Sequence, residues 1–167
     1  MPQLRYSSRV FKTSSRKHPY WCWNFRNPHV RLRSSCPQFL QKLQNHGHYR
    51  VMVCDGEREF EIHKIFRSGL AKFFNLIVIN SGSANFLYQR ILKHIEVAPT
   101  HVAVVAGYLE SGIIPAHQAG VSRLYQLHNS NRWEALSQPP SHGIVSQSIR
   151  DLSEIRIQSA ECLNREY

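Results

Sequence analysis

The chain has 167 residues, of which 42% are hydrophobic, 11% aromatic and 19% charged, a composition that excludes a chain disordered throughout. Its length suits one domain with a real core and a tail at each end. The net charge is +10, yet no apolar run approaches the roughly 18 residues of a membrane span, and we expect no signal peptide. The four cysteines are therefore expected as reduced thiols in a cytoplasmic or nuclear protein.

The positive charge is concentrated in residues 1–36, which are rich in Arg and Ser and contain no acidic residue. One interpretation of this segment is a flexible tail. A second is a mitochondrial transit peptide, which shares this composition. A third is a basic arm that binds nucleic acid, with aromatic side chains that stack on exposed bases. Those side chains are Tyr20, Trp21, Trp23 and Phe25.

Regular patterns begin after the tail. Apolar side chains at helical spacing predict a short helix that ends near Gly47, and residues 49–54 predict a strand because they are apolar and β-branched. The dipeptide Asp55-Gly56 is a strong turn signal, and residues 57–62 then alternate charged with apolar side chains. We therefore expect a β-hairpin here. The apolar face of the preceding helix consists of Phe39, Leu40 and Leu43.

The period changes beyond the expected hairpin. Helical spacing over residues 65–77 predicts two short helices that are separated at Ser68-Gly69. Residues 81–83 are expected to form a loop, and residues 91–97 a short strand. The residues on helical spacing are Ile65, Phe66, Leu70, Phe73, Phe74 and Ile77.

The last part of the chain is expected to be helical. Pro99 suits the first turn of a helix that Gly112 would end. A further helix is expected around Leu124, residues 138–141 break the chain, and a short helix is expected over residues 149–157. Apolar residues on helical spacing in the first two of these helices are Val102, Val105, Ala106, Leu109, Val121, Leu124 and Tyr125.

Several segments, in this order, resemble the BTB/POZ family of protein-interaction domains. The resemblance is carried by Phe39–Leu43, His48–Val53, Phe60–Lys64, Ser68–Phe74 and Gly107–Ile113. It implies an α+β fold in which short β-strands and a hairpin pack with a cluster of α-helices. The expected limits are a basic tail at 1–36, the BTB/POZ-like domain at 37–137 and a C-terminal extension at 138–167.

The resemblance implies an adaptor that pairs with itself or a related domain and links a target to a cullin-type ubiquitin ligase. The dimer interface would contain Phe39, Leu40, Leu43 and Tyr49. The surface for the second partner would contain Phe86, Tyr88 and Tyr125. An alternative function is nucleic-acid binding through residues 1–36, and a third possibility is an organellar protein that loses this tail on import.

No enzyme is expected from the sequence. It contains no Cys-x-x-Cys pair for a zinc site, no Gly-x-Ser-x-Gly nucleophile turn and no phosphate-binding loop. We therefore predict no catalytic residue, no metal site and no cofactor.

Overall fold

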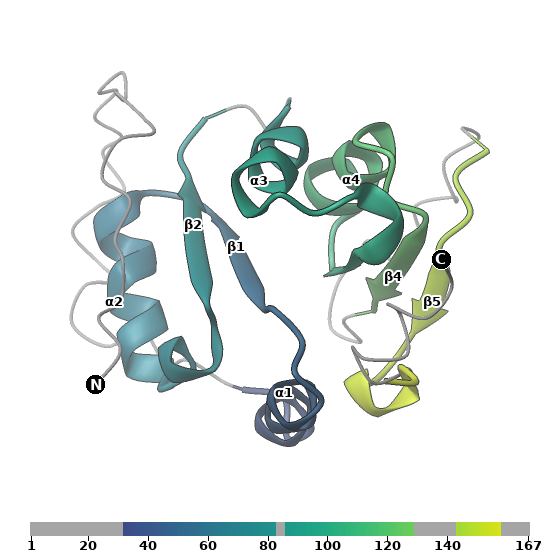
Figure 1. Cartoon of the computed structure of the whole chain (residues 1–167). Helices are drawn as coiled ribbons and strands as arrows, with labels where there is room; N and C mark the ends of the chain where they lie inside the picture. The colour runs from purple at the N-terminus through teal and green to yellow at the C-terminus, as the bar shows by residue number, and fades with distance from the viewer. Residues whose placement is uncertain (1–31, 83–85, 129–142, 158–167) are drawn as a thin grey trace. The chain divides into compact units, whose positions relative to one another are not determined.

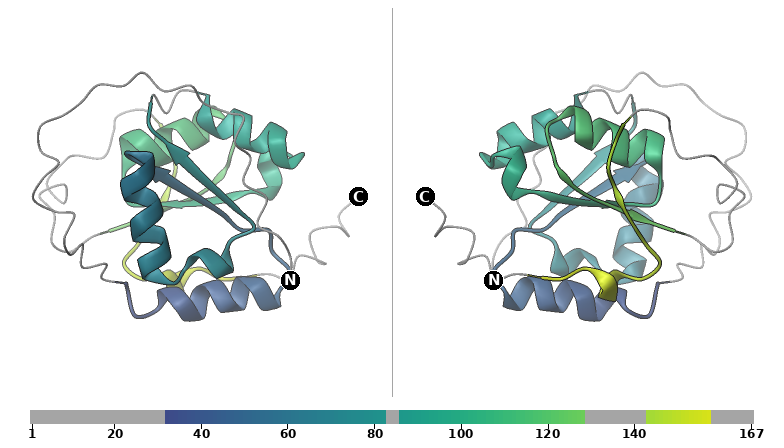
Figure 2. Two further views of the ribbon diagram at one scale, coloured as in Figure 1. Left: turned by 90° about the vertical axis from the view of Figure 1, so that its left-hand side faces the viewer. Right: turned by 90° about the vertical axis from the view of Figure 1, so that its right-hand side faces the viewer.

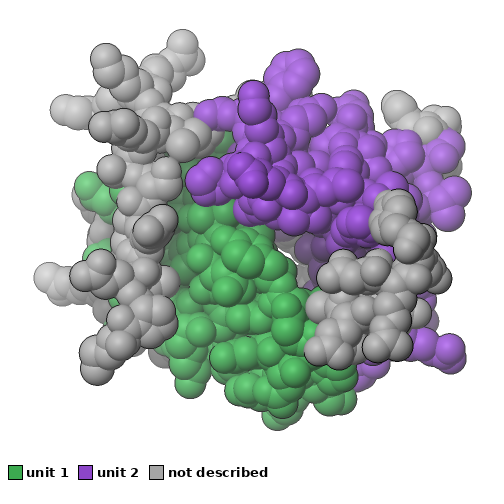
Figure 3. Space-filling view, viewed as in Figure 1, with its two compact units in different colours: residues 1–82 green, residues 83–167 purple. Residues whose placement is uncertain are grey.

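The structure is a computed structural model that describes residues 32–82, 86–128 and 143–157. The chain divides into two compact units, unit 1 (residues 1–82) and unit 2 (residues 83–167), which Figure 3 colours separately. Each unit is described by itself. Every pairing between described strands is parallel. Parallel strands need long connections between them, and these are usually helical, so both units belong to the α/β class.

Unit 1 contains one parallel pair of strands. Its elements are α1 (Cys36–Asn45), β1 (Val51–Asp55), α2 (Arg58–Ser68), the 3-10 turn η2 (Ala71–Phe73) and β2 (Leu76–Asn80). Strand β1 pairs with β2 from Val51 opposite Leu76 to Asp55 opposite Asn80. The connection runs through α2, which lies alongside the two strands (Figures 1 and 2). The result is a β-α-β unit in which both strands end at the same edge of the sheet.

The expected helix before the first strand is confirmed as α1. Pro37 lies in its first turn, where a missing amide hydrogen is harmless. Leu40 of this helix is buried with Leu70 and Phe73, and these three residues form the core cluster of unit 1. The strand expected over residues 49–54 is confirmed as β1.

The expected β-hairpin is wrong, because the segment after Gly56 is the helix α2. Its first turn carries Glu59 and Glu61, and carboxylates there interact favourably with the helix dipole. Six alternating residues are too few to distinguish the two-residue period of a strand from the 3.6-residue period of a helix. The break after Ser68 is confirmed, since α2 ends there, but Ile77 lies in the strand β2 rather than in a helix.

Unit 2 contains a three-stranded parallel sheet in the order β3-β4-β5. Its main elements are α3 (Leu87–Ile95), β3 (Ala103–Ala106), α4 (Ile114–Gln118), β4 (Arg123–Leu127) and β5 (Gln147–Ile149). Short turns complete it at η3 (Pro99–His101), η4 (Leu109–Ile113) and η6 (Leu152–Glu154). The core cluster of unit 2 consists of Leu92, Val104, Ile113, Ala116, Ala119, Val121 and Leu124.

Three expected elements of unit 2 have the wrong type. The segment expected as a strand at 91–97 mostly belongs to the helix α3. The helix expected from Pro99 is a 3-10 turn followed by the strand β3, and the helix expected around Leu124 is the strand β4. Short apolar runs fit either period, and pairing with distant parallel strands decides the outcome.

The end of the chain also differs from the expectation. Instead of a short helix over residues 149–157, β5 ends at Ile149 and only the 3-10 turn η6 follows. The expected chain break at residues 138–141 lies outside the described residues, as do the aromatic residues of the basic tail. Within the described ranges, no helix is long and apolar enough to cross a membrane.

Gly112 is required by the core of unit 2. It lies buried in η4, and a Cβ atom built on it would overlap the Cβ of Ala106 at the end of β3. The glycine therefore allows η4 to pack directly on the strand. The BTB/POZ-like α+β fold is thus wrong, and the observed architecture is α/β with parallel sheets.

Candidate functional site

The candidate site lies in unit 1, where β1 and β2 end. In open α/β sheets, ligands bind outside the carboxyl ends of the parallel strands. Strand β1 ends in Asp55 and β2 ends in Asn80, and the register places these two residues opposite each other. The Asn80 side-chain amide Nδ2 donates hydrogen bonds to Asp55 Oδ1 and to the carbonyl oxygen of Gly82, each at 3.0 Å.

The two residues differ in exposure. Asn80 is buried, whereas Asp55 is exposed to solvent. The buried side-chain amide of Asn80 donates to two acceptors, which fixes its orientation. The amide in turn fixes the position of Asp55 Oδ1. The printed hydrogen bond uses only Oδ1, and the exposure of Asp55 leaves its carboxylate accessible to a ligand.

The turn after β1 brings a charged pair close to this carboxylate. Gly56 has a φ of 150°, and a Cβ atom there would lie only 2.7 Å from Glu61 Oε1. Only glycine allows the turn to pack on that buried carboxylate. Glu61 forms an ion pair of 2.6 Å with Lys64 one turn along α2. The ammonium of Lys64 is therefore already balanced by Glu61.

Cys54 precedes the candidate carboxylate but is not a reactive thiol. Burial, together with the negative charge of Glu61 and Asp55 against the opposing charge of Lys64, raises its pKa to about 11. A thiol with that pKa is protonated near neutral pH, and the thiolate is the nucleophilic form. Asp55 is therefore the reactive group that this edge of the sheet offers.

A magnesium ion does not fit the described residues of this site. Magnesium prefers near-octahedral coordination by oxygen atoms. The described ranges contain no group of three or more His, Cys, Asp or Glu side chains that could hold a metal ion. At the strand ends, Asn80 turns its amide NH₂ rather than its oxygen toward Asp55. No chemical step is therefore assigned to a metal here.

The corresponding strand end in unit 2 has a different character. Strand β3 ends at Ala106 and is followed by Gly107 and the exposed Tyr108. The carbonyl oxygen of Tyr108 accepts a hydrogen bond of 3.2 Å from the amide of Ile113, which closes η4. Glu110 is exposed within that turn. No carboxylate directly ends a strand in this described part, so unit 1 carries the better candidate.

The four residues assigned to a dimer interface lie in or just after α1. Leu40 is 6% exposed and belongs to the core, Phe39 and Leu43 are half-buried, and Tyr49 is 56% exposed. The parallel sheets contradict the BTB/POZ resemblance that suggested this interface. Contact of these residues with a partner therefore stays a prediction that the fold does not support.

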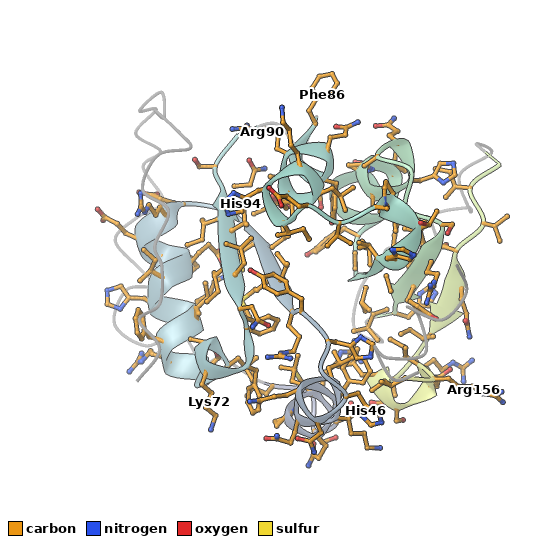
Figure 4. The ribbon with its side chains drawn as sticks, viewed as in Figure 1. His46, Lys72, Phe86, Arg90, His94 and Arg156 are labelled. Carbon is orange, nitrogen blue, oxygen red and sulfur yellow. The ribbon has the colours of Figure 1, made fainter. Side chains whose placement is uncertain are left out.

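The three residues assigned to a second partner surface belong to unit 2. Phe86 is 71% exposed and precedes α3, where Figure 4 shows it pointing away from the ribbon. Tyr88 is half-buried against the core cluster, and Tyr125 is half-buried in β4. Only Phe86 has the exposure of a docking side chain, and no observation tests such a contact.

Comparison with known proteins identifies the fold. No family model matches the chain, and no curated protein matches it by sequence. Among solved structures, a protein of Thermotoga maritima described as a beta-phosphoglucomutase has a TM-score of 0.59 at 19% identity, with 81% of this chain covered. A haloacid dehalogenase-like family hydrolase of Xanthomonas campestris has a TM-score of 0.60 at 16% identity, with 72% covered.

The HAD-hydrolase YfnB of Bacillus subtilis, whose structure contains magnesium, also has a TM-score of 0.60, at 17% identity and with 72% of this chain covered. The chain spans 61%, 50% and 52% of the lengths of these three structures, in the order given. It therefore shares the fold of haloacid dehalogenase-like hydrolases over little more than half of their length.

These comparisons correct the sequence-based interpretation. The fold neighbours are hydrolases and not BTB/POZ domains, so the predicted family is wrong. The adaptor function and the pairing with a related domain or a cullin scaffold rested on that family, whereas the prediction of no enzyme rested on the absence of catalytic motifs. The hydrolase fold of the neighbours contradicts all three.

Asp55 and Asn80 were missed as site residues. The sequence predicts a hairpin turn at Asp55, and the helix that it predicts over residues 65–77 includes only the start of the run that ends in Asn80. The signal that could have found them is the position of each, since each polar residue directly follows a short apolar run. That position marks the carboxyl end of a buried strand in α/β folds.

Proposed function

We propose that this protein is a hydrolase in which the carboxylate of Asp55 acts as the nucleophile on a small substrate. The single observation that carries this proposal is the exposed Asp55 carboxylate at the end of β1, oriented by the buried Asn80 of the neighbouring strand. The likeness of the fold to hydrolases supports the same reaction class.

The reaction has two steps. In the first, Asp55 Oδ2 forms a bond to an electrophilic carbon or phosphorus atom, and the leaving group departs with the bonding electron pair. In the second, water cleaves the resulting ester or acyl phosphate, which releases the hydroxylated product and one proton and restores the carboxylate. Covalent catalysis of this kind divides one difficult step into two easier ones.

Asn80 is a positioning residue in this scheme. Its hydrogen bond to Oδ1 keeps Asp55 from rotating, so Oδ2 stays directed toward the substrate. Because Lys64 is already paired with Glu61, its charge is not free to balance a doubly charged phosphate. This favours a substrate with at most one negative charge, such as a 2-haloacid, over a phosphate monoester.

The test measures halide release from 2-haloacids and phosphate release from p-nitrophenyl phosphate, with and without added magnesium. We expect halide release that does not depend on magnesium, and a loss of at least about 100-fold in kcat for Asp55→Asn. Glu57→Gln is the matched control, because Glu57 is an exposed carboxylate of the same turn. It should retain the activity.

Single turnover in H₂¹⁸O provides a second measurement. With a 2-haloacid as substrate, water attacks the acyl carbon of the Asp55 ester, so ¹⁸O enters the peptide that contains Asp55, whereas direct attack of water on the substrate labels only the product. Full activity of Asp55→Asn, ¹⁸O in the hydroxyacid product alone, or no turnover of either substrate class would each contradict the proposal.

A further inference from the structure

A buried carboxylate of unit 1 lies directly beside the candidate site. Glu61, near the start of α2, is only 6% exposed. Its Oε1 is so close to Gly56, the residue after Asp55, that a Cβ atom on Gly56 would lie 2.7 Å from it. Because so little of Glu61 is exposed, its effect on a substrate at the end of β1 is electrostatic rather than through contact.

The ion-pair partner of this carboxylate is more exposed. Lys64 Nζ lies 2.6 Å from Glu61 Oε1, and 37% of the Lys64 side chain is exposed. The ammonium also lies 5.0 Å from the centre of the Phe60 ring, within the range of a cation–π contact. The same Glu61 oxygen thus lies against both the ammonium and the turn that follows Asp55. Of the two charges, the ammonium is the one that a ligand can reach.

Both charges act at the end of β1. Burial is the main cause of the raised pKa of the Cys54 thiol, and beyond it Glu61 raises this pKa while Lys64 lowers it. Cys54 directly precedes Asp55 in the strand. The strand end that carries the proposed nucleophile therefore experiences the two charges of the pair, and these oppose each other there.

Stability alone does not account for a carboxylate at position 61. Removing a charged side chain from water costs free energy, and a buried ion pair often stabilises a protein no more than apolar side chains of similar volume do. An apolar residue in place of Glu61 would leave the ammonium of Lys64 with its full charge beside the strand end. What the carboxylate adds is therefore the balance of that charge.

We propose that Glu61 determines the charge of the ligand that this site accepts: by pairing with Lys64, it keeps the ammonium from binding a second negative charge and so excludes phosphate monoesters. The inference rests on the proposed function, because it takes the end of β1 as the substrate site. Glu61 acts through Lys64 and is a positioning residue. Removing its charge should admit doubly charged ligands to the site.

The test compares Glu61→Gln with the unmodified full chain, with inorganic phosphate as the probe at mildly alkaline pH. Titration calorimetry should show binding to the variant that is at least about tenfold tighter, because an unpaired ammonium attracts a dianion. Phosphate should also inhibit halide release competitively in this variant only. Glu59→Gln is the matched control, since it removes an exposed carboxylate from the same part of α2, and it should change neither measurement.

The double variant Glu61→Gln/Lys64→Met also serves where Glu61→Gln alone fails to fold. It replaces the pair by two neutral side chains, so it should reject phosphate and keep its KM for a 2-haloacid within about twofold of the unmodified chain. Phosphate binding that persists in the double variant would place the ligand on another cation, such as the exposed Arg58, and overturn the proposal. A rise of KM by more than about tenfold would show that Lys64 binds substrate despite its pairing, and would overturn it as well.

Alkylation of Cys54 distinguishes the failure of this inference from the failure of the proposed function. Without the charge of Glu61, the attraction of Lys64 for the thiolate is less opposed, so iodoacetamide should alkylate Cys54 at least about threefold faster in Glu61→Gln. Faster alkylation with phosphate binding, in a chain that releases no halide, would support the inference and contradict the proposed hydrolase. Halide release without any gain of phosphate binding in Glu61→Gln would overturn the inference and leave the hydrolase standing, whether or not the alkylation rate changes.

Discussion

The two units use the same parallel arrangement of strands but bury it to different degrees. In unit 2, β4 has a strand on each side, and its Leu124 is buried together with Val104 of β3. In unit 1, β1 and β2 each have one neighbour among the described strands, and their side chains are half-buried except for the exposed Asp55 and the buried Asn80. The sheet of unit 2, with its third strand, thus contributes to a continuous core, whereas the two-stranded sheet of unit 1 is only partly buried.

The comparison also explains where reactive chemistry can be placed. The small core of unit 1 leaves the end of β1 exposed, and Asp55 lies there. In unit 2, the corresponding end of β3 is closed by η4, whose Gly112 and Ile113 are buried. A strand end that is covered by packing supports the core, and one that stays open is available to a ligand.

The largest effect is expected from truncating the core of unit 2. Ile113 is 0% exposed, so Ile113→Ala should lower the free energy of unfolding by about 3–5 kcal/mol through lost burial and a cavity. The matched change in unit 1, Leu40→Ala, should cost about 2 kcal/mol, because a less complete core can collapse around the deletion. Urea unfolding followed by circular dichroism measures both. If Leu40→Ala lowers the free energy of unfolding by as much as Ile113→Ala or more, the core of unit 1 is not the less complete of the two.

A smaller effect is expected where η4 packs on β3. Gly112→Ala should destabilise the protein by about 1–3 kcal/mol, because the new methyl group overlaps Ala106. Gly107→Ala is the control, since its Cβ would meet only the carbonyl oxygen of Leu127 at an ordinary 3.6 Å. Thermal unfolding of the two variants compares them. Equal melting temperatures would show that η4 is not tightly packed.

The smallest effect concerns the thiol in unit 1. The pKa of Cys54 is raised to about 11 from 9.0, so the native state binds a proton more tightly than the unfolded state. This contribution to stability is present below pH 9 and is lost as the pH rises from about 9 to about 11. We therefore expect stability to decline slightly in that window, and the Cys54→Ala variant should lack this part of the decline.

The same thiol gives a chemical measurement. Alkylation of Cys54 by iodoacetamide should be slow near neutral pH and should accelerate toward pH 11, because only the thiolate reacts. Mass spectrometry of the Cys54 peptide follows the rate. Rapid alkylation at neutral pH would mean that this strand end is more open than its burial indicates.

Local patterns predicted the elements that depend on local interactions. The helix α1 has an apolar face that recurs at helical spacing, and the end of α2 at Gly69 follows from a residue that commonly ends helices. The strand β1 was recognised from its β-branched residues. These features are decided within a few residues of the chain.

The errors lie where distant pairing decides. Asp55-Gly56 is a good hairpin signal, but β1 pairs in parallel with Leu76–Asn80, and the residues between them form α2. The apolar spacing from Val102 to Leu109 suits a helix, yet Ala103–Ala106 pairs with Arg123–Gln126. In a parallel sheet, paired strands lie far apart in the sequence, so a short stretch of residues does not reveal which strands pair. The sequence did not predict the candidate site because Asp55 and Asn80 are brought together by such a pairing.

The parallel registers have a consequence for how the protein folds during synthesis. Val51 pairs with Leu76, Ala103 pairs with Arg123, and Tyr125 pairs with Gln147, so each described strand pairs with the next or the previous one along the chain. No described pairing joins the two halves of the chain. Each parallel pair can therefore form soon after its second strand leaves the ribosome, and unit 1 can fold before unit 2 is complete. The registers thus allow the order of assembly to follow the order of translation.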